Sequence, residues 1–326
     1  MSLDADQIVD RRRMRRKLTF WRVLAVVLAI GAVIGLGAAA RTPGLGLGWL
    51  SGQPGASIAR ISITGLILSD QERVEALDRL ASSRAKAVIV HVNSPGGTTA
   101  GSEQLYHALL ALKSKKPMVV VVDGLAASGA YIAAIAADHI VSQETSLVGS
   151  VGVLFQFPNV GDLLGKIGVS MEEIKSSPLK AAPNGFEPTS PEARAAIAAL
   201  VKDSYDWFRD LVKDRRHLDD AGLEVVADGR VFTGRQGVPL KLVDELGDEQ
   251  TAIAWLAKEK NIDPKTPVSD YSLHGRLGDL PFLHTAAGAI LDAAGLGAFA
   301  RHLDEWGAVQ AVDRLNLDGL LALWHP

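Results

Sequence analysis

The chain contains no cysteine, which excludes a thiolate nucleophile, a thiolate metal site and a disulfide framework. Aromatic residues make up only 6% of its 326 residues, and the formal net charge is −3. A net charge this small is not typical of a nucleic-acid-binding protein, and a hydrophobic share of nearly half is not typical of a disordered chain. With 48% hydrophobic residues, the chain is long enough for one large domain or two modest ones.

The small net charge conceals a dense cationic block, RRRMRRK, at residues 11–17. An apolar segment at residues 20–41 follows it, and its uninterrupted run approaches the ~20 residues that cross a bilayer as a helix. Because cationic residues stay on the cytoplasmic side, we expect the N-terminus inside and everything after Arg41 outside. A cleaved signal peptide is the alternative, since GAAAR at residues 37–41 offers small residues to a processing enzyme. The length of the apolar run favours an uncleaved anchor.

Composition divides the chain into five parts. Residues 1–19 form the basic, cytoplasmic N-terminus of this interpretation, and residues 20–41 form the transmembrane anchor. Residues 42–56 are rich in glycine and proline, which is typical of a linker. Residues 57–263 are expected to fold as the main domain. Residues 264–326, rich in alanine, leucine and glycine, are predicted to be helices that serve assembly or packing.

Within the main domain, segments with strand and helix patterns alternate. Strands are predicted at residues 57–65, 86–93 and 117–124, and helices at residues 69–83, 98–116 and 126–137. Later segments are predicted as an extended stretch at 146–155, a short strand at 171–177, and helices at 189–216 and 249–261. The helix at 189–216 is expected to open with a capping box from Thr189 to Glu192. This order predicts an α/β fold with a mostly parallel sheet covered by helices.

Two predicted strands end in unusual sequence, and ligands of parallel α/β sheets bind at such ends. NSPGG at residues 93–97 follows the second strand, and DGLAASGAY at residues 123–131 follows the third. The glycines of the first segment leave backbone N–H groups open to a developing oxyanion, although an ordinary Pro-Gly turn has the same sequence. In the second segment Ser128 begins a helix, where a hydroxyl serves either as a nucleophile or merely as a cap or packing spacer.

A nucleophilic serine needs a base. None of the eight histidines lies in a catalytic motif, and the GxSxG elbow is absent because Ala126 stands two positions before Ser128. A lysine can serve instead where desolvation keeps it neutral. Lys180 lies among small and apolar neighbours, whereas Lys175 follows Glu172 and Glu173, which would hold its proton. Lys180 is therefore the better candidate, and a solvated loop lysine is the alternative.

Five motifs occur in an order and spacing that resemble the signal peptide peptidase A family of serine–lysine peptidases. They are VNSPGG, ASGAYIAA, GSVGV, KSSPLK and ADGRVFTGRQGVPLKLVDELG, and the resemblance spans about Ile61 to Leu256. It implies a crotonase/ClpP-like fold of repeated ββα units, preceded by one N-terminal transmembrane helix. The chain resembles the single-repeat bacterial type.

Carried over by motif, the resemblance implies that Ser128 is the nucleophile, Lys180 the general base and Ser150 the residue that orients the lysine. Gly96 or Gly97, with the N–H of Gly129, would form the oxyanion hole. Two positions depart from the family pattern. Ala130 replaces a second glycine after the nucleophile, and Ala181–Ala182 stand where an acidic residue commonly follows the lysine.

The resemblance implies a Ser/Lys endopeptidase of the bacterial inner membrane, single-pass, with its catalytic domain on the periplasmic or extracytoplasmic side. Its substrates would be cleaved signal peptides and other extended apolar peptides, and it would need no metal or cofactor and bind no nucleic acid. In single-repeat relatives the serine and lysine of one site come from adjacent protomers of a ring, which predicts a homo-oligomer. A crotonase-like acyl-CoA enzyme and a non-enzymatic membrane scaffold are the alternatives.

Overall fold

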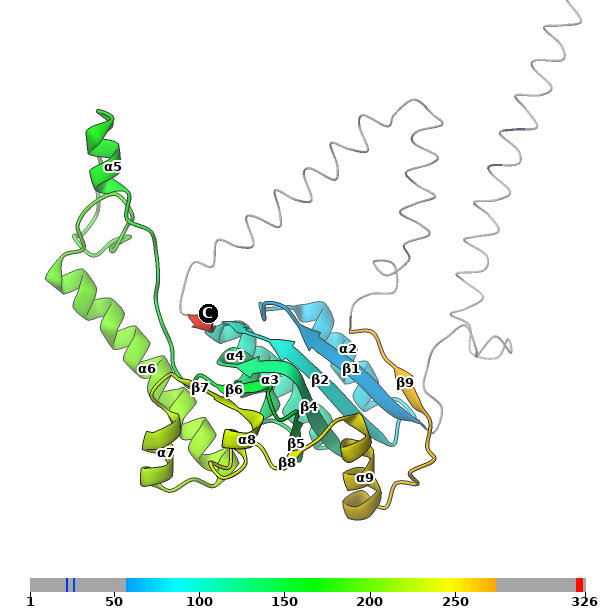
Figure 1. The fold of residues 1–326 in the computed structure, drawn as a ribbon. Helices are drawn as coiled ribbons and strands as arrows, with labels where there is room; N and C mark the ends of the chain where they lie inside the picture. Colours follow the sequence, from blue (N-terminus) through cyan, green and yellow to red (C-terminus); the bar gives the residue numbers. More distant parts are fainter. Residues whose placement is uncertain (1–21, 23–25, 27–56, 274–320, 325–326) are drawn as a thin grey trace, which may run out of the picture. The chain divides into compact units, whose positions relative to one another are not determined.

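The computed structural model describes residues 57–273 and 321–324, together with Arg22 and Val26 (Figure 1). The chain divides into two units, Met1–Gln53 and Pro54–Pro326. In the first, only Arg22 and Val26 are described, and both are helical and exposed. Among the described residues, no helix is long and apolar enough to cross a membrane. The expected anchor and linker lie outside the described residues, apart from those two positions.

The second unit is built on an eight-stranded sheet whose main path is β7-β6-β4-β2-β1-β9. Its centre consists of three parallel strands, β1 (Ile58–Thr64), β2 (Ala87–Ser94) and β4 (Met118–Ala127). The shorter strands are β5 (His139–Ser142), β6 (Leu147–Gly149), β7 (Val231–Thr233), β8 (Glu245–Leu246) and β9 (Val268–Asp270). In this sheet β7 runs antiparallel to β6, and the other pairs are parallel. The α/β class with a mostly parallel sheet is therefore confirmed.

Helices cover both faces of this sheet, because alternate residues of the central strands bury their side chains on opposite sides. Val88, Val90 and Val92 belong to the larger core cluster, whereas Ala87 and Ile89 pack in a second cluster with α9 (Glu249–Lys260). The larger cluster also includes side chains of α2 (Gln71–Ala81), α3 (Thr99–Lys113), α4 (Gly129–Ala134) and α6 (Pro191–Arg216). The run of apolar residues in β2 is thus buried on both faces, as its sequence predicts.

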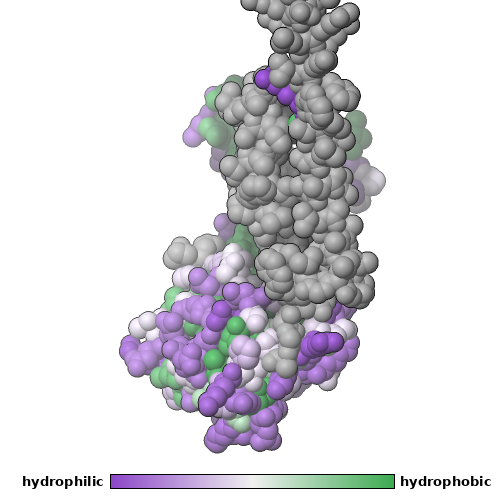
Figure 2. All heavy atoms as spheres, turned by 90° about the vertical axis from the view of Figure 1, so that its right-hand side faces the viewer, coloured by the Kyte–Doolittle hydropathy of each residue, from purple (hydrophilic) through white to green (hydrophobic). Residues whose placement is uncertain are grey.

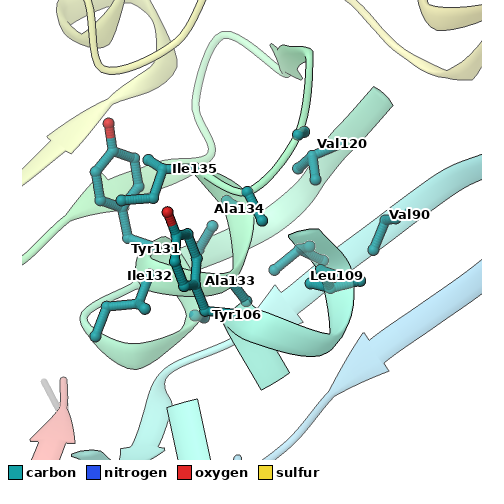
Figure 3. Packing of buried hydrophobic residues seen from close by; sticks show 14 of the residues in the cluster. Val90, Tyr106, Leu109, Val120, Tyr131, Ile132, Ala133, Ala134 and Ile135 are labelled. Atoms are coloured by element: carbon teal, nitrogen blue, oxygen red, sulfur yellow. The ribbon is translucent and has the colours of Figure 1, made fainter. Parts of the chain in front are cut away.

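The short helix α4 lies deep in the larger cluster, and every one of its residues is buried. Its side chains pack near Tyr106 and Leu109 of α3 and near Val90 and Val120 of the sheet (Figure 3). The phenol of Tyr131 donates a hydrogen bond to the carbonyl of Leu242 at 2.8 Å, and burial raises the pKa of this phenol. In the view of Figure 2, polar side chains cover most of the described surface, with small apolar groups between them.

The remaining helices are α5 (Gly161–Lys166), α7 (Asp220–Val226) and α8 (Gly234–Gly237). We use the name arm for residues 155–190, which contain α5 and the segment joining it to α6. The arm lies to one side of the sheet in Figure 1 and does not cover it. Most of its residues are exposed.

Several expectations about local structure were wrong. No strand forms at residues 171–177. The cap of α6 is Ser190, whose hydroxyl accepts from the N–H of Ala193, and not Thr189. The NSPGG segment is not a simple turn, because Gly96–Thr98 forms strand β3, which pairs with β10 (Leu321–Leu323).

The tail of the chain also contains strands in its described parts. Strand β9 lies beyond residue 263 and pairs with β1 in the main sheet, so the sheet extends past the expected boundary of the main domain. The second strand of the tail, β10, lies at residues 321–323. The predicted helices between these two strands lie outside the described residues.

Candidate active site

Ser128 joins the end of β4 to the start of α4 in a conformation that few L-residues adopt. Its φ is 55° and its ψ is −119°, a backbone strain that persists only where the surroundings enforce it. Here the N–H of Ser128 donates to the carbonyl of Gly149 at 2.7 Å, and its own carbonyl accepts from Tyr131 N at 2.9 Å. The residue is 1% exposed. Strained serines at strand-to-helix junctions are typical of nucleophiles.

The side chain of Ser128 is not used as a helix cap. Although Ser128 is the N-cap residue of α4, its hydroxyl accepts no hydrogen bond from the first turn. Its Oγ instead lies 3.5 Å from the carbonyl oxygen of Gly152, which is a long contact for a hydroxyl donor. The cap hypothesis from the sequence is therefore wrong, and the hydroxyl remains available for chemistry.

At its other end α4 is held by Arg215 of α6. The guanidinium donates to the carbonyls of Ile135, Ala136 and Ala137 at 2.8–3.2 Å. A cation at a helix C-terminus satisfies carbonyls that lack intrahelical partners. Together with the Tyr131–Leu242 hydrogen bond, this contact fixes the helix and hence the position of Ser128.

Ser150 lies beside the nucleophile candidate. It follows Gly149, whose carbonyl accepts from Ser128, and it is buried with a φ of 52°. The N–H of Ser150 donates to the carbonyl of Arg230 at 2.8 Å. Two buried serines with positive φ are therefore connected through Gly149, so the structure brings Ser128 and Ser150 together as the sequence motifs predict.

The predicted oxyanion glycines adjoin the same junction. Ser94, at the end of β2, pairs with Ala126 of β4, which brings the following glycines near Ser128. Gly96 has a φ of +99°, and a Cβ at Gly97 would lie 1.9 Å from the carbonyl oxygen of Ile67. A side chain is therefore excluded at Gly97 and strained at Gly96.

Lys180 lies in the arm, in a turn where its N–H donates to Ser177 O at 3.1 Å. Its side chain is exposed, and within residues 57–273 and 321–324 the structure records no hydrogen bond or ion pair for its amine. A single chain does not join Lys180 to Ser128. The predicted serine and lysine are thus present but not assembled.

Lys175, the other lysine of this loop, is engaged in ion pairs. Its Nζ lies 2.5 Å from Glu173 and 2.8 Å from Glu187. The hydrogen bonds to Glu173 and then Glu187 raise the pKa of the Lys175 amine, which keeps it protonated. Glu173 therefore pairs with Lys175 as its sequence position suggests, and Glu187 takes the place expected for Glu172.

Sequence reasoning missed a polar cluster on the side of the sheet covered by α9. Both ring nitrogens of His91 face carboxylates, Asp123 at 2.9 Å and Glu249 at 2.8 Å. Glu249 also binds Arg60 with two hydrogen bonds of 2.6 Å. No nitrogen of His91 is left for a serine, which agrees with the weak support for a Ser–His–Asp site. Among the described residues, no group of three His, Asp or Glu side chains could hold a metal ion.

The parallel sheet and the buried, strained serine fit the class of serine-type peptidases of α/β fold. The sequence model of peptidase family S49 matches residues 110–263. The model of the Clp protease family matches residues 69–146, which supports a ClpP-like fold. The chain is 36% identical over 209 residues to slr0021 of Synechocystis sp., named as a suspected protease. That alignment covers 64% of this chain and 76% of the relative. The chain therefore belongs to peptidase family S49.

Two further similarities extend this result. A protein of Enterococcus faecium, named as a suspected signal peptide peptidase SppA, is 30% identical over 226 residues, with 65% of this chain and 66% of the relative covered. The resemblance to signal peptide peptidase A is thus confirmed as an S49 relationship. A mutant of ClpP1 from Listeria monocytogenes superimposes with a TM-score of 0.41 at 13% identity, covering 63% of this chain and 96% of that one. So loose a superposition carries no argument about function.

Proposed function

We propose that this chain is a Ser/Lys endopeptidase in which Ser128 is the nucleophile and Lys180 the general base. The observation that carries the proposal is the state of Ser128. The residue is buried, its backbone is strained, and its hydroxyl does not cap the helix. In the first step Ser128 Oγ attacks a peptide carbonyl while its proton passes to the neutral amine of Lys180. The lysine then donates that proton to the leaving nitrogen, and an acyl-enzyme forms. Water cleaves the ester by the reverse proton path and restores Ser128.

The tetrahedral intermediate needs donors for its oxyanion. We assign this role to the N–H of Gly96 or Gly97 together with the N–H of Gly129. Gly129 opens α4, where unpaired N–H groups and the helix dipole favour negative charge. Ser150, beside Ser128, is assigned the role of hydrogen-bonding the lysine and orienting it.

We further propose that the lysine reaches the serine from a neighbouring copy of the chain in a ring. The arm that carries Lys180 exposes an unusual number of large apolar side chains: Leu163, Ile167, Val169, Met171, Ile174, Leu179 and Phe186. Exposed apolar groups in one segment are typical of a surface that a partner covers. Burial against the neighbouring copy would also remove water from Lys180 and favour the neutral amine that a base requires.

The N-terminal sequence supports a location at the bacterial inner membrane. A basic block followed by the apolar segment at residues 20–41 would anchor the chain with its catalytic domain outside the cytoplasm. Cleaved signal peptides, released into the same membrane, would then be concentrated at the site. Extended apolar peptides of this kind are the proposed substrates.

The test follows hydrolysis of an unstructured apolar peptide by the full chain in detergent. Ser128→Ala removes the nucleophile and should lower kcat by about 10⁶-fold. Lys180→Ala should lower kcat/KM by about 10²–10⁴-fold, the range for loss of a proton-transfer group. Lys175→Ala is the matched control and should retain most activity, because its amine is paired with Glu173 and Glu187.

A mixture of the two inactive variants separates a shared site from a site within one chain. Co-assembled Ser128→Ala and Lys180→Ala copies should regain part of the activity, since one copy still provides the serine and the other the lysine. Failure of the mixture to recover, with both single variants inactive, would contradict the shared site. Full activity of both single variants would contradict the dyad itself.

A further inference from the structure

Strand β4 contains an irregularity shortly before Ser128. From Val92 to Ser94 strand β2 advances by two residues, whereas the paired stretch of β4, from Val122 to Ala126, advances by four. The additional residues of β4 form a β-bulge, a feature that is common beside active sites because it redirects the strand and its side chains. The bulge of β4 is therefore a candidate for a part of the site.

The bulge lies where β4 changes its neighbour. Before it, residues 119–122 pair with β5, and after it, residues 125–127 pair with β6. Both of these strands lie beside β4 in Figure 1. The N–H of Ser128 then donates to the carbonyl of Gly149, the last residue of β6, at 2.7 Å. The bulge thus sets where β4 meets β6, and hence where the backbone of Ser128 is held.

The backbone of the bulge is held by Ser146, in the loop that joins β5 to β6. Ser146 is 3% exposed, and its Oγ lies 3.1 Å from the carbonyl oxygens of both Val122 and Asp123. A bulge disrupts the hydrogen bonds between neighbouring strands, and the hydroxyl supplies a donor at the disrupted positions.

The side chain of the bulge is held by the polar cluster described above. An ionised carboxylate accepts but does not donate, so His91 Nδ1 donates to Asp123, whose two oxygens lie at 2.9 and 3.0 Å. His91 Nε2 lies 2.8 Å from Glu249, which Arg60 holds with two hydrogen bonds of 2.6 Å. Arg60 also pairs with Asp270 at 2.7 Å. The Asp123 side chain is thereby connected to side chains of β2, α9 and β1.

We propose that Asp123 and His91 are positioning residues for Ser128, which they keep in place by fixing the bulge of β4. The proposal rests on the proposed role of Ser128 as nucleophile. Neither residue transfers a proton to the substrate in this scheme, because both ring nitrogens of His91 face carboxylates. The pair acts through the stretch of backbone between Asp123 and Ser128.

Exposure and geometry together indicate that the pair matters more for catalysis than for folding. The side chain of Asp123 is 42% exposed and that of His91 is 18% exposed. An ion pair with so exposed a partner contributes little to stability. A displacement of a reacting group by ~1 Å, in contrast, can lower the rate by about 100-fold.

The first test measures peptide hydrolysis by the full chain in detergent with Asp123 replaced. Asp123→Ala should lower kcat by about 100-fold and leave KM within about twofold, because Ser128 is displaced while substrate binding is untouched. Asp123→Asn keeps an oxygen that accepts from His91 Nδ1 and should retain most of the wild-type kcat. Both thermal midpoints should stay within about 4 °C of wild type. An unchanged kcat in Asp123→Ala, or a loss of kcat that only accompanies a larger loss of thermal stability, would overturn the proposal.

The second test uses His139 as a matched control for His91. His139 also lies on a strand beside β4, with Nε2 3.3 Å from Glu245 and Nδ1 3.8 Å from Asp244, but its strand β5 pairs with β4 in a regular register. His91→Gln should lower kcat at least about tenfold, because the glutamine amide cannot donate to both carboxylates from the positions of the two ring nitrogens. His139→Gln should leave kcat unchanged. Equal kcat values for the two variants would overturn the proposal.

Hydrogen–deuterium exchange distinguishes failure of this proposal from failure of the proposed function. In Asp123→Ala, fragments that cover residues 125–131 should exchange at least about tenfold faster than in wild type, and fragments from α2 should exchange equally. If this difference is found but even the wild-type chain hydrolyses no peptide, the bulge positions Ser128 and the peptidase assignment fails. If the wild-type chain hydrolyses peptides and residues 125–131 exchange equally in both chains, the positioning role is contradicted.

Discussion

The sheet region and the arm differ in how their apolar side chains are used. In the sheet region, Ser128 is 1% exposed and sits on a helix with no exposed residue. In the arm, α5 buries none of its residues, and large apolar side chains such as Ile167 and Ile174 face solvent. A single chain therefore buries the serine completely. The same chain carries the lysine on a segment, residues 155–190, in which no residue is buried.

The prediction with the largest expected effect concerns whether the arm is an interface between copies of the chain. Replacing both Ile167 and Ile174 by Asp should abolish the oligomer and lower peptide hydrolysis by at least about 100-fold, because the base would no longer be delivered. The thermal midpoint of the single chain should stay within about 2 °C, since neither side chain is buried. Analytical ultracentrifugation, activity assays and thermal unfolding give the three measurements.

Val225 provides the control for this prediction. It is a 50% exposed apolar residue on α7, outside the arm. Val225→Asp adds the same kind of charge and should leave both oligomer and activity unchanged. An intact oligomer in the arm variant would show that the arm is merely solvent-exposed.

A second prediction compares the same substitution, leucine to alanine, in the sheet region and in the arm. Leu109 of α3 is fully buried against α4, whereas Leu163 of α5 is 59% exposed. Leu109→Ala should lower the free energy of unfolding by about 3 kcal/mol, because it removes buried methyl groups and leaves a cavity. Leu163→Ala should change it by less than about 0.5 kcal/mol. Chemical denaturation measures both, and equal losses would contradict the contrast between the regions.

The smallest expected effect concerns acid stability. The two hydrogen bonds from Arg60 hold the pKa of Glu249 below its ordinary value of 4.5. The stability that this carboxylate contributes is present above pH 4.5 and is lost as the pH falls through the lowered pKa. Glu249→Gln should therefore destabilise the protein by about 1 kcal/mol at neutral pH, and by less in acid.

Glu187 of the arm is the matched comparison for Glu249. The hydrogen bond from Lys175 lowers the pKa of Glu187 as well, but the Glu187 side chain is 55% exposed to solvent. Glu187→Gln should have no measurable effect on unfolding at any pH. Unfolding followed by circular dichroism between pH 3 and 7 measures both variants, and a larger effect for Glu187 would contradict the contrast.

Much of the fold could be predicted because its signals are local. The β-branched run of β2 and the helical spacing in α9 each depend on neighbours in sequence, and each is confirmed. The simple turn considered for residues 93–97 was wrong for a different reason. The Gly96–Thr98 segment is a strand because Leu321–Leu323 pairs with it, and nothing near it in sequence indicates that partner.

The candidate site shows the same division. The residue types of Ser128, Ser150 and the glycines at 96 and 97 could be recognised from motifs, and the structure places all of them around the end of β4. Their conformations could not be recognised. The positive φ of Ser128 depends on its bond to Gly149, and the glycine requirement at 97 comes from the carbonyl of Ile67.

By itself, the sequence determined which chemistry is available: a serine and a lysine, no thiol, and a parallel α/β sheet. These follow from residue identity and from periodicity along the chain. Only the tertiary structure decided that the serine hydroxyl does not cap the helix, that Lys180 remains exposed, and that residues 321–323 pair with the glycine strand β3. The physical reason is that hydrogen bonding and burial between distant segments depend on their approach in space, which local patterns do not encode.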